Sequence, residues 1–109
     1  MLMRVLVTGG AGFIGSCICE ELAKRDFEVS ILDNFSSGHR SNVQHLLDAG
    51  SHKVRLFVGD CTKSDDLAGA LDGVDVVFHF AANPEVRLEL SDPETCFRQN
   101  VYATHVVLE

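Results

Sequence analysis

Residues 5–16 read VLVTGGAGFIGS, which is the pattern of a short apolar strand, a glycine-rich turn and the first turn of a helix. This order presents backbone N–H groups to a pyrophosphate at a helix N-terminus. We expect Gly9 to make the tight turn out of the strand and Gly12 to let phosphate oxygens approach the backbone. Gly15 would let the helix pack closely on the sheet. The stretch therefore predicts a dinucleotide-binding turn.

The G-x-x-G-x-x-G spacing of these glycines differs by one residue from the usual G-x-G-x-x-G, so the prediction depends on the residues around them. Four apolar residues follow the turn at helical spacing: Ile14, Cys17, Ile18 and Leu22. Asp33 stands 18 positions after Gly15, close to the expected separation of ~20. The alternative is a glycine-rich strand-to-helix turn that binds no ligand.

Asp33 ends the second expected strand. A carboxylate at this position can accept hydrogen bonds from both hydroxyls of an adenosine ribose, and it would repel a 2′-phosphate. The residue therefore favours NAD over NADP, although Arg40, seven residues further on, could bind a phosphate. The alternative role for Asp33 is to cap a helix or turn.

A strand followed by a helix occurs four times along the chain, with no solenoid repeat or low-complexity linker. Nearly continuous apolar runs are typical of parallel strands that are covered on both faces. We expect strands over 3–8, 28–32, 53–58 and 74–80, and helices over 12–24, 42–49, 64–71 and 92–109. Right-handed crossovers between these units predict an α/β, Rossmann-type doubly wound parallel sheet with strand order 3-2-1-4.

The expected helices have recognisable ends and faces. Ser41 is expected to cap the second helix and Gly50 to close it, while Asp92 and Pro93 begin the final helix. The sheet-facing positions of the first helix are expected to be Ile14, Ile18 and Leu22. The inward stripe of the final helix is expected to be Cys96, Phe97, Asn100, Val101, Thr104 and Leu108.

Several polar or small residues stand where a ligand could contact them. Asn100 is an amide on an apolar stripe, so it either bonds a backbone turn or lines a site, because an unpaired amide costs about 1–3 kcal/mol. Asp60 follows the third strand and could accept a hydrogen bond from an adenine amino group or cap the next helix. Ala81 and Ala82 follow the fourth strand and would let a flat group lie against the backbone.

The composition is that of an acidic globular protein, with 109 residues, 46% of them hydrophobic, and a formal net charge of −7. The length fits one domain. No basic stripe is present to release counterions from nucleic acid, so we expect no DNA or RNA partner. No apolar run reaches the ~20 residues of a membrane span, and residues 1–4 leave no room for a signal peptide. We therefore expect a cytoplasmic protein without a membrane partner.

The four cysteines and five histidines do not follow a metal-binding pattern. Cys17 and Cys19 are two apart on an expected helix and point to different faces, and no C-x-x-C pair or His/Cys cluster offers tetrahedral ligands. We expect reduced thiols and no metal site. His79 lies inside an apolar strand, where we expect an imidazole whose hydrogen bonds are satisfied.

Five motifs, in their order and spacing, resemble the extended short-chain dehydrogenases, and among them the NAD-dependent epimerase/dehydratase group. The motifs are TGGAGFIGS at 8–16, LDN at 32–34, GD at 59–60, HFAA at 79–82, and Asn100-Val101 with Thr104. The resemblance runs the length of the chain, and it implies a role for each motif in binding NAD.

For the adenosine half of NAD, the resemblance implies that Asp33 and Asn34 hold the ribose, with Ser37 and Gly38 beside it. Adenine would be flanked by the residues of another motif, Asp60 and Cys61. The pyrophosphate would accept hydrogen bonds from the backbone N–H groups of two residues, Phe13 and Ile14.

For the nicotinamide half, the resemblance implies that Phe80, Ala81 and Ala82 line the path to the ring. Asn100 would lie behind this half of the cofactor. No catalytic residue is expected in the chain, because the family's catalytic Ser or Thr and its Tyr-x-x-x-Lys pair would follow residue 109. Tyr102 is the only tyrosine, and no lysine follows it.

The resemblance therefore implies that residues 1–109 are the N-terminal part of a dinucleotide-binding domain, inactive when alone. The complete protein is expected to be a homodimeric NAD-dependent enzyme that epimerises a nucleotide sugar at C4 through a 4-keto intermediate. A nucleotide-sugar 4,6-dehydratase and a non-catalytic NAD-binding module are the alternatives.

Overall fold

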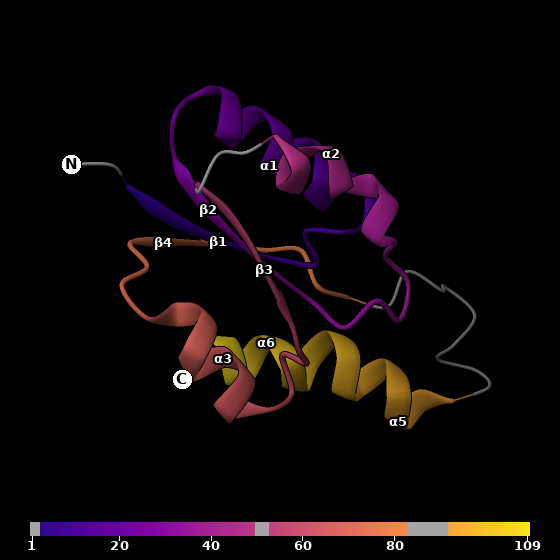
Figure 1. Cartoon of the computed structure of the whole chain (residues 1–109). Coiled ribbons are helices and arrows are strands. Elements are labelled where there is room, and N and C mark those ends of the chain that lie inside the picture. Colours follow the sequence, from indigo (N-terminus) through magenta and orange to yellow (C-terminus); the bar gives the residue numbers. More distant parts are fainter. Residues whose placement is uncertain (1–2, 50–52, 83–91) are drawn as a thin grey trace.

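The computed structural model describes residues 3–49, 53–82 and 92–109. The strands are β1 (Arg4–Thr8), β2 (Glu28–Asp33), β3 (Val54–Val58) and β4 (Val76–His79) (Figure 1). The α-helices are α1 (Phe13–Lys24), α2 (Gln44–Asp48), α3 (Ser64–Leu71), α5 (Pro93–Cys96) and α6 (Ala103–Leu108). A 3-10 turn, η1 (Arg40–Asn42), precedes α2, and a π-helical segment, η2 (Phe97–Tyr102), joins α5 to α6. Within these ranges, no helix combines the length and apolar character needed to cross a membrane.

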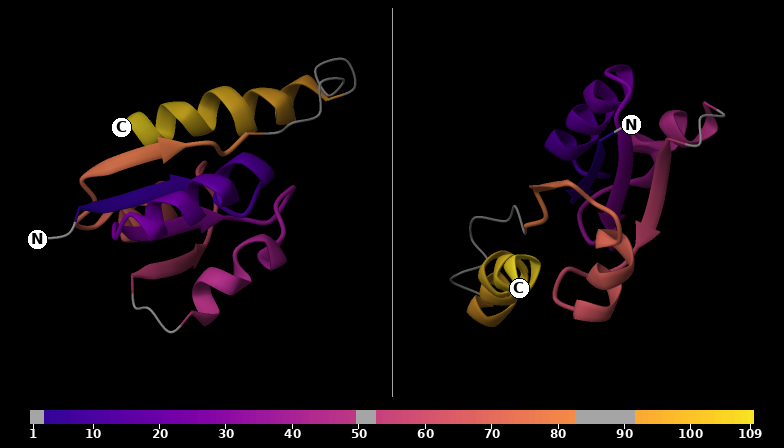
Figure 2. Two further views of the ribbon diagram at one scale, coloured as in Figure 1. Left: turned by 90° about the horizontal axis from the view of Figure 1, so that it is seen from above. Right: turned by 90° about the vertical axis from the view of Figure 1, so that its left-hand side faces the viewer.

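The four strands form one parallel sheet of order β3-β2-β1-β4. In its register, Val7 of β1 lies between Ile31 of β2 and Phe78 of β4. The helices α1 and α2 lie on one face of the sheet, and α3 lies with α5 and α6 on the other (Figures 1 and 2). The predicted doubly wound sheet and its strand order are confirmed, and the carboxyl ends of all four strands share one edge.

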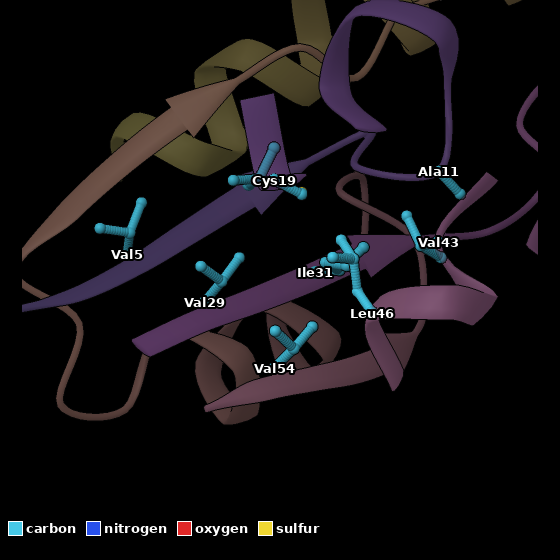
Figure 3. Close-up of a cluster of buried hydrophobic side chains, with 9 residues drawn as sticks. Val5, Ala11, Cys19, Val29, Ile31, Val43, Leu46 and Val54 are labelled. Atoms are coloured by element: carbon cyan, nitrogen blue, oxygen red, sulfur yellow. The ribbon is translucent and has the colours of Figure 1, made fainter. Parts of the chain in front are cut away.

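Two apolar cores fill the spaces between the sheet and its helix layers, because alternate residues of a strand point to opposite faces. The buried residues on the side of α1 and α2 are Val5, Val7, Ala11, Cys19, Val29, Ile31, Val43, Leu46 and Val54 (Figure 3). Those on the side of α3 and α6 are Leu6, Leu32, Cys61, Leu67, Ala70 and Ala103. Full burial of one valine or leucine side chain contributes about 1.5–3 kcal/mol, so the cores fix the positions of the strand ends.

The buried face of α1 differs from the prediction. Gly15 and Cys19 are buried, whereas Ile14 is 59% exposed; Leu22 packs against the core as expected. A Cβ on Gly15 would overlap the carbonyl oxygen of Gly9, so the first turn of α1 rests on the glycine-rich loop rather than on the sheet. This contact sets the rotation of the first turns, where the buried positions are displaced by one residue from the predicted Ile14 and Ile18.

The final helical segment begins as predicted. Asp92 is the N-cap of α5 and accepts a hydrogen bond from the Thr95 N–H at 3.2 Å, and Pro93 follows in the first turn. The segment then leaves the α-helical pattern in η2, where i→i+5 hydrogen bonds widen the turn by one residue.

The π-helical turn changes which residues face the core. Phe97 and Val101 were expected to point inward but are more than half exposed, and Leu108 is 81% exposed. The residues of α6 that pack against the second core are Ala103, Val106 and Val107. An inward stripe drawn at α-helical spacing is therefore wrong at these positions. The extra residue of the wide turn accounts for Val101 and Leu108, whereas Phe97 begins η2 and precedes it.

The predicted start of the second helix also differs. Ser41 caps no helix, since it lies inside η1, where His39 N–H and the Asn42 amide both donate to the Ala11 carbonyl, at 3.0 and 2.8 Å. These bonds tie the segment to the glycine-rich loop as a 3-10 turn. The third strand ends at Val58 as predicted, and this residue is exposed because β3 is an edge strand. Gly50, the predicted end of the second helix, lies outside the described residues.

Candidate functional site

A pocket opens at the edge of the sheet where the carboxyl ends of the strands meet. Ligands of open α/β sheets bind at this edge. Its walls come from the glycine-rich loop, the segments that follow β2, β3 and β4, and the final helical segment. The lining residues are Gly9, Gly12, Leu32, Asp33, Asn34, Ser36, Ser37, Gly38, Gly59, Asp60, Cys61, Thr62, Phe80, Ala81, Ala82, Gln99 and Ala103.

The glycine-rich loop leaves β1 by a turn that requires glycine. Gly9 has φ of +69°, and a Cβ there would lie 2.8 Å from backbone atoms of Phe80 and Ala81. Its N–H donates to the carbonyl of Leu32 at 2.8 Å. The loop is thus held against the ends of both neighbouring strands, β2 and β4.

The start of α1 leaves backbone donors available. No side chain caps the helix at Gly12, and the N–H groups of Phe13 and Ile14 donate no hydrogen bond within the described part of the chain. A Cβ on Gly12 would approach only the Gly9 oxygen, at 3.3 Å, so its other side is open. Free N–H groups at the positive end of a helix dipole are a site for an anion.

Asp33 is 9% exposed, and both of its carboxylate oxygens accept backbone hydrogen bonds. One oxygen accepts from the Ala11 N–H at 3.0 Å and the other from the Phe35 N–H at 2.8 Å. A Cβ on Gly38 would lie 2.9 Å from the first oxygen, so the loop after β2 also passes close to this carboxylate. Asp33 therefore caps a turn, as its alternative role supposed. Each oxygen still has a lone pair for a second donor.

Asp60 closes a turn of its own rather than capping α3. Its Oδ1 accepts from the Thr62 N–H at 2.8 Å and from the Thr62 hydroxyl at 2.7 Å. Asp66, in the first turn of α3, accepts the Asp60 N–H at 2.9 Å. Burial raises the pKa of Asp60, but the Thr62 bonds, the charge of Lys63 and a bond from Asn34 together lower it below its usual value. The group is a carboxylate that can accept further hydrogen bonds.

Cys61 presents a protonated thiol to the pocket. Burial, followed by the negative charge of Asp60, raises the pKa of Cys61 to about 11. Burial raises the pKa of Cys19 on α1 to about 12. Cys61 therefore offers a neutral surface beside Asp60, which suits contact with a flat apolar ring better than contact with an anion.

His79, the last residue of β4, makes the two hydrogen bonds that were expected of a satisfied imidazole, although it is only half-buried. Its Nδ1 lies 2.6 Å from the Thr8 hydroxyl, and its Nε2 lies 2.9 Å from the Thr104 hydroxyl. Burial lowers the pKa of His79, so its neutral form is favoured in the folded protein. The residue joins the end of β1 to α6.

The pocket brings together most of the residues predicted to bind the cofactor. Those that line it are Gly9, Gly12, Asp33, Asn34, Ser37, Gly38, Asp60, Cys61, Phe80, Ala81 and Ala82. Gly15 is buried beneath the loop, and the side chains of Phe13 and Ile14 are exposed, although their N–H groups meet no acceptor among the described residues. Asn100 lies in η2 and is not among the lining residues.

Six lining residues were missed. Four of them are neighbours of predicted residues at or after the strand ends, where proximity along the chain was the available signal: Leu32, Ser36, Gly59 and Thr62. Gln99 is the neighbour of the predicted Asn100, but it is Gln99 that lines the pocket. Ala103 had no such signal, because it lies on α6 beyond the π-helical turn.

The cysteines at positions 17, 19, 61 and 96 are free thiols. Over residues 3–49, 53–82 and 92–109, no group of three His, Cys, Asp or Glu side chains is placed to hold a metal ion. The chemistry that the described site offers is therefore that of backbone donors, two carboxylates and apolar walls.

Comparison with known proteins gives consistent matches over nearly the whole chain. Residues 5–109 match the model of the NAD dependent epimerase/dehydratase family. A Bacillus subtilis (strain 168) protein named "Uncharacterized UDP-glucose epimerase YtcB" is 44% identical over 91 residues, covering 78% of this chain and 28% of that protein. The dTDP-glucose 4,6-dehydratase of Mycobacterium tuberculosis (strain CDC 1551 / Oshkosh) is 36% identical over 110 residues, covering 98% and 32%.

Among solved structures, the UDP-glucose 4-epimerase of Thermus thermophilus in complex with NAD has a TM-score of 0.84 and 38% identity. The match covers 97% of this chain and 32% of that one. The chain thus spans about a third of the length of the relatives that it matches. Because the family model matches residues 5–109 and relatives at 36% identity cover 98% of the chain, the chain belongs to the NAD dependent epimerase/dehydratase family.

Proposed function

We propose that this chain is the NAD-binding part of a nucleotide-sugar 4-epimerase that acts on UDP-glucose. The observation that carries the proposal is the meeting, in one pocket, of the uncapped start of α1 and the buried Asp33 carboxylate. Relatives named as UDP-glucose epimerases support the substrate. Because the chain spans about a third of these relatives, the catalytic groups are proposed to lie in the rest of the protein.

The residues of the pocket fit the adenosine and pyrophosphate parts of NAD. The free N–H groups of Phe13 and Ile14 suit a pyrophosphate, and the open side of Gly12 leaves room for its oxygens. The Asp33 oxygens can each accept one ribose hydroxyl beside the backbone N–H that they already hold. The same negative charge disfavours the 2′-phosphate of NADP. Asn34, with its neighbours Ser37 and Gly38, would complete the ribose site.

The other residues would place the two rings. Cys61 and Asp60 offer a neutral surface and a hydrogen-bond acceptor for adenine. The backbone of 80–82 would border the nicotinamide half, with Asn100 behind it. Bound NAD supplies a hydride acceptor and donor for C4 of the sugar, and this chain's residues bind and orient it.

A nucleotide-sugar 4,6-dehydratase is the second candidate. The observation in its favour is the identity of 36% over 98% of the chain with the Mycobacterium tuberculosis dTDP-glucose 4,6-dehydratase. The two reactions share the first oxidation at C4 and diverge afterwards. The pocket described above would bind NAD for either enzyme, so only the products separate them.

The test is to incubate the full-length protein with UDP-glucose and, separately, with dTDP-glucose. An epimerase forms UDP-galactose from the first substrate, whereas a dehydratase forms a 4-keto-6-deoxy sugar from the second. A Gly12→Val variant of the same protein is the matched control, because it should fold but not hold NAD. A wild-type protein that binds NAD and forms neither product would contradict both proposed activities.

A further inference from the structure

Two segments that are far apart in the sequence form the walls of the pocket near β4. One wall is the backbone of 80–82, which follows β4, and the other carries Gln99 and Ala103 from η2 and α6. Thr8, at the end of β1, lies beneath the first wall, and its hydroxyl oxygen accepts the N–H groups of Phe80 at 3.1 Å and Ala81 at 3.2 Å.

The donor and acceptor in each hydrogen bond of His79 can be derived from the Thr104 hydroxyl. The Thr104 hydroxyl donates its only hydrogen to the Asn100 carbonyl at 2.7 Å. It can therefore only accept from His79, which fixes the imidazole proton on Nε2. Nδ1 is then an acceptor and takes the hydrogen of the Thr8 hydroxyl.

These bonds form one chain with a consistent direction. It runs from the backbone N–H groups of the first wall through Thr8, His79 and Thr104 to the Asn100 carbonyl in the π-helical turn. Every hydroxyl and ring nitrogen in the chain has a defined partner. Fully satisfied polar networks of this kind rigidify the elements that they join.

We propose that His79 is a positioning residue that holds the two walls at a fixed separation and so shapes the nicotinamide end of the pocket. This inference rests on the proposed binding of NAD. The imidazole is the link that spans both walls, because Thr8 lies on β1 and Thr104 on α6, and His79 bonds to each. Asp33, Asn34 and Asp60 come from the ends of β2 and β3, on the other side of β1 from β4, and take no part in the chain.

The experiment compares two ligands on the full-length protein by calorimetry: NAD, which would occupy the whole pocket, and AMP, which would occupy only the adenosine end. Thr104→Val removes the hydroxyl and keeps the shape, so it breaks the link to the helix alone. We expect Thr104→Val to lower the affinity for NAD about tenfold and the affinity for AMP by less than about twofold. Thr104→Ser, which keeps the hydroxyl, should retain the wild-type affinity for NAD. His79→Phe, which removes both bonds, should show the same selectivity.

His105→Gln is the matched control, because His105 is an exposed histidine on the same helix, paired with Glu109 at 3.3 Å. It should leave both affinities unchanged. Imidazole ¹⁵N chemical shifts give an independent readout that does not depend on variants. They should show that the imidazole of His79 carries its proton on Nε2 and that Nδ1 is unprotonated.

Three results would overturn the inference. Equal losses of NAD and AMP affinity in Thr104→Val would indicate a general effect on folding instead of positioning. Unchanged NAD affinity in both Thr104→Val and His79→Phe would remove His79 from the site. An imidazole protonated on Nδ1 would reverse the chain of bonds. A wild-type protein that binds AMP but not NAD would be different, since it would overturn the proposed function itself.

Discussion

The Asp33 carboxylate accepts a hydrogen bond from the Ala11 N–H at 3.0 Å, which joins the end of β2 to the loop after β1. The side chain proposed to bind the ribose therefore also holds the loop proposed to bind the pyrophosphate. The two roles considered for Asp33, ligand and turn cap, are compatible, because a carboxylate oxygen accepts two hydrogen bonds. The cofactor preference of the pocket and the shape of its loop depend on one residue.

Replacing Asp33 should affect binding and stability together. We expect Asp33→Ala to lower the affinity for NAD more than tenfold, because the acceptors for the ribose hydroxyls are lost. The affinity for NADP should rise relative to that for NAD, because the negative charge is lost as well. The free energy of unfolding should fall by about 1–3 kcal/mol, since the N–H groups of Ala11 and Phe35 lose their acceptor. Calorimetry with both cofactors and urea unfolding measure the two effects. Unchanged NAD affinity without a gain for NADP would show that Asp33 does not meet the ribose.

Substitutions of two glycines in the loop should have different effects, one on NAD binding and the other on stability. Gly12→Val should leave a folded protein without NAD affinity, because a Cβ there meets only one atom, at 3.3 Å, and the rest of the side chain enters the pyrophosphate site. Gly15→Ala should destabilise the fold, because its Cβ would overlap the Gly9 carbonyl. Gly69→Ala is the control, since it has open space on α3 and should stabilise by about 0.5–1 kcal/mol. Circular dichroism and NAD titration distinguish the variants, and an unfolded Gly12→Val would make Gly12 a folding residue.

His79 should make stability depend on pH in a defined direction. Burial lowers its pKa below the ordinary value of ~6.5, so the unfolded chain takes up this proton first as pH falls. The contribution of His79 to the free energy of unfolding is complete above pH ~6.5 and is lost as pH falls from there toward the folded pKa. Urea unfolding of the wild type and His79→Phe across this window should give curves that converge at lower pH. Parallel curves would contradict the expectation.

The thiols should react in the order of their exposure. Cys17 is exposed, whereas burial raises the pKa of Cys61 to about 11 and of Cys19 to about 12. Since the thiolate is the nucleophile, alkylation at neutral pH should modify Cys17 well before Cys19 or Cys61. Mass spectrometry of digested samples gives the order, and Cys17→Ser should remove the fast phase. Modification of Cys19 as fast as Cys17 would mean that α1 opens readily.

The isolated chain of 109 residues should be catalytically inactive and should associate with itself. In the described residues β4 pairs with β1 alone, which leaves its other edge unpaired. Phe97, Val101 and Leu108 add exposed apolar surface on the final helical segment. Light scattering at micromolar concentration should detect oligomers, and Val101→Asp should reduce them. A monodisperse, heat-stable monomer that binds NAD as tightly as the intact protein would show that these elements suffice as a domain.

The positions of the strands and of the residues after them could be predicted because they depend on local patterns. The apolar runs ending at Thr8, Asp33 and His79 have the length and flanking residues of parallel strands, and parallel strands bring their carboxyl ends together. This geometry was enough to place Asp33, Asp60, Ala81 and Ala82 around one pocket, whereas Phe80 was placed there by the family resemblance.

The rotation of the helices could not be predicted in the same way. The face of α1 depends on the contact of Gly15 with the Gly9 carbonyl, which exists only once the loop has folded. The face of α6 depends on the wide turn of η2, and no residue between Phe97 and Tyr102 indicates a π-helix by its type. Ala103 was missed for this reason, as was the exposure of Val101 and Leu108.

The alternation of side chains along β1 makes this strand intolerant of a change in length. Val5 and Val7 belong to one core and Leu6 to the other, so a residue inserted before Thr8 would exchange the layers that these side chains fill. It would also turn the Thr8 hydroxyl away from His79 and shift Gly9 from the place where its backbone clears Phe80 and Ala81. We therefore expect related sequences to vary in the composition of this strand but not in the number of residues between its start and the first glycine.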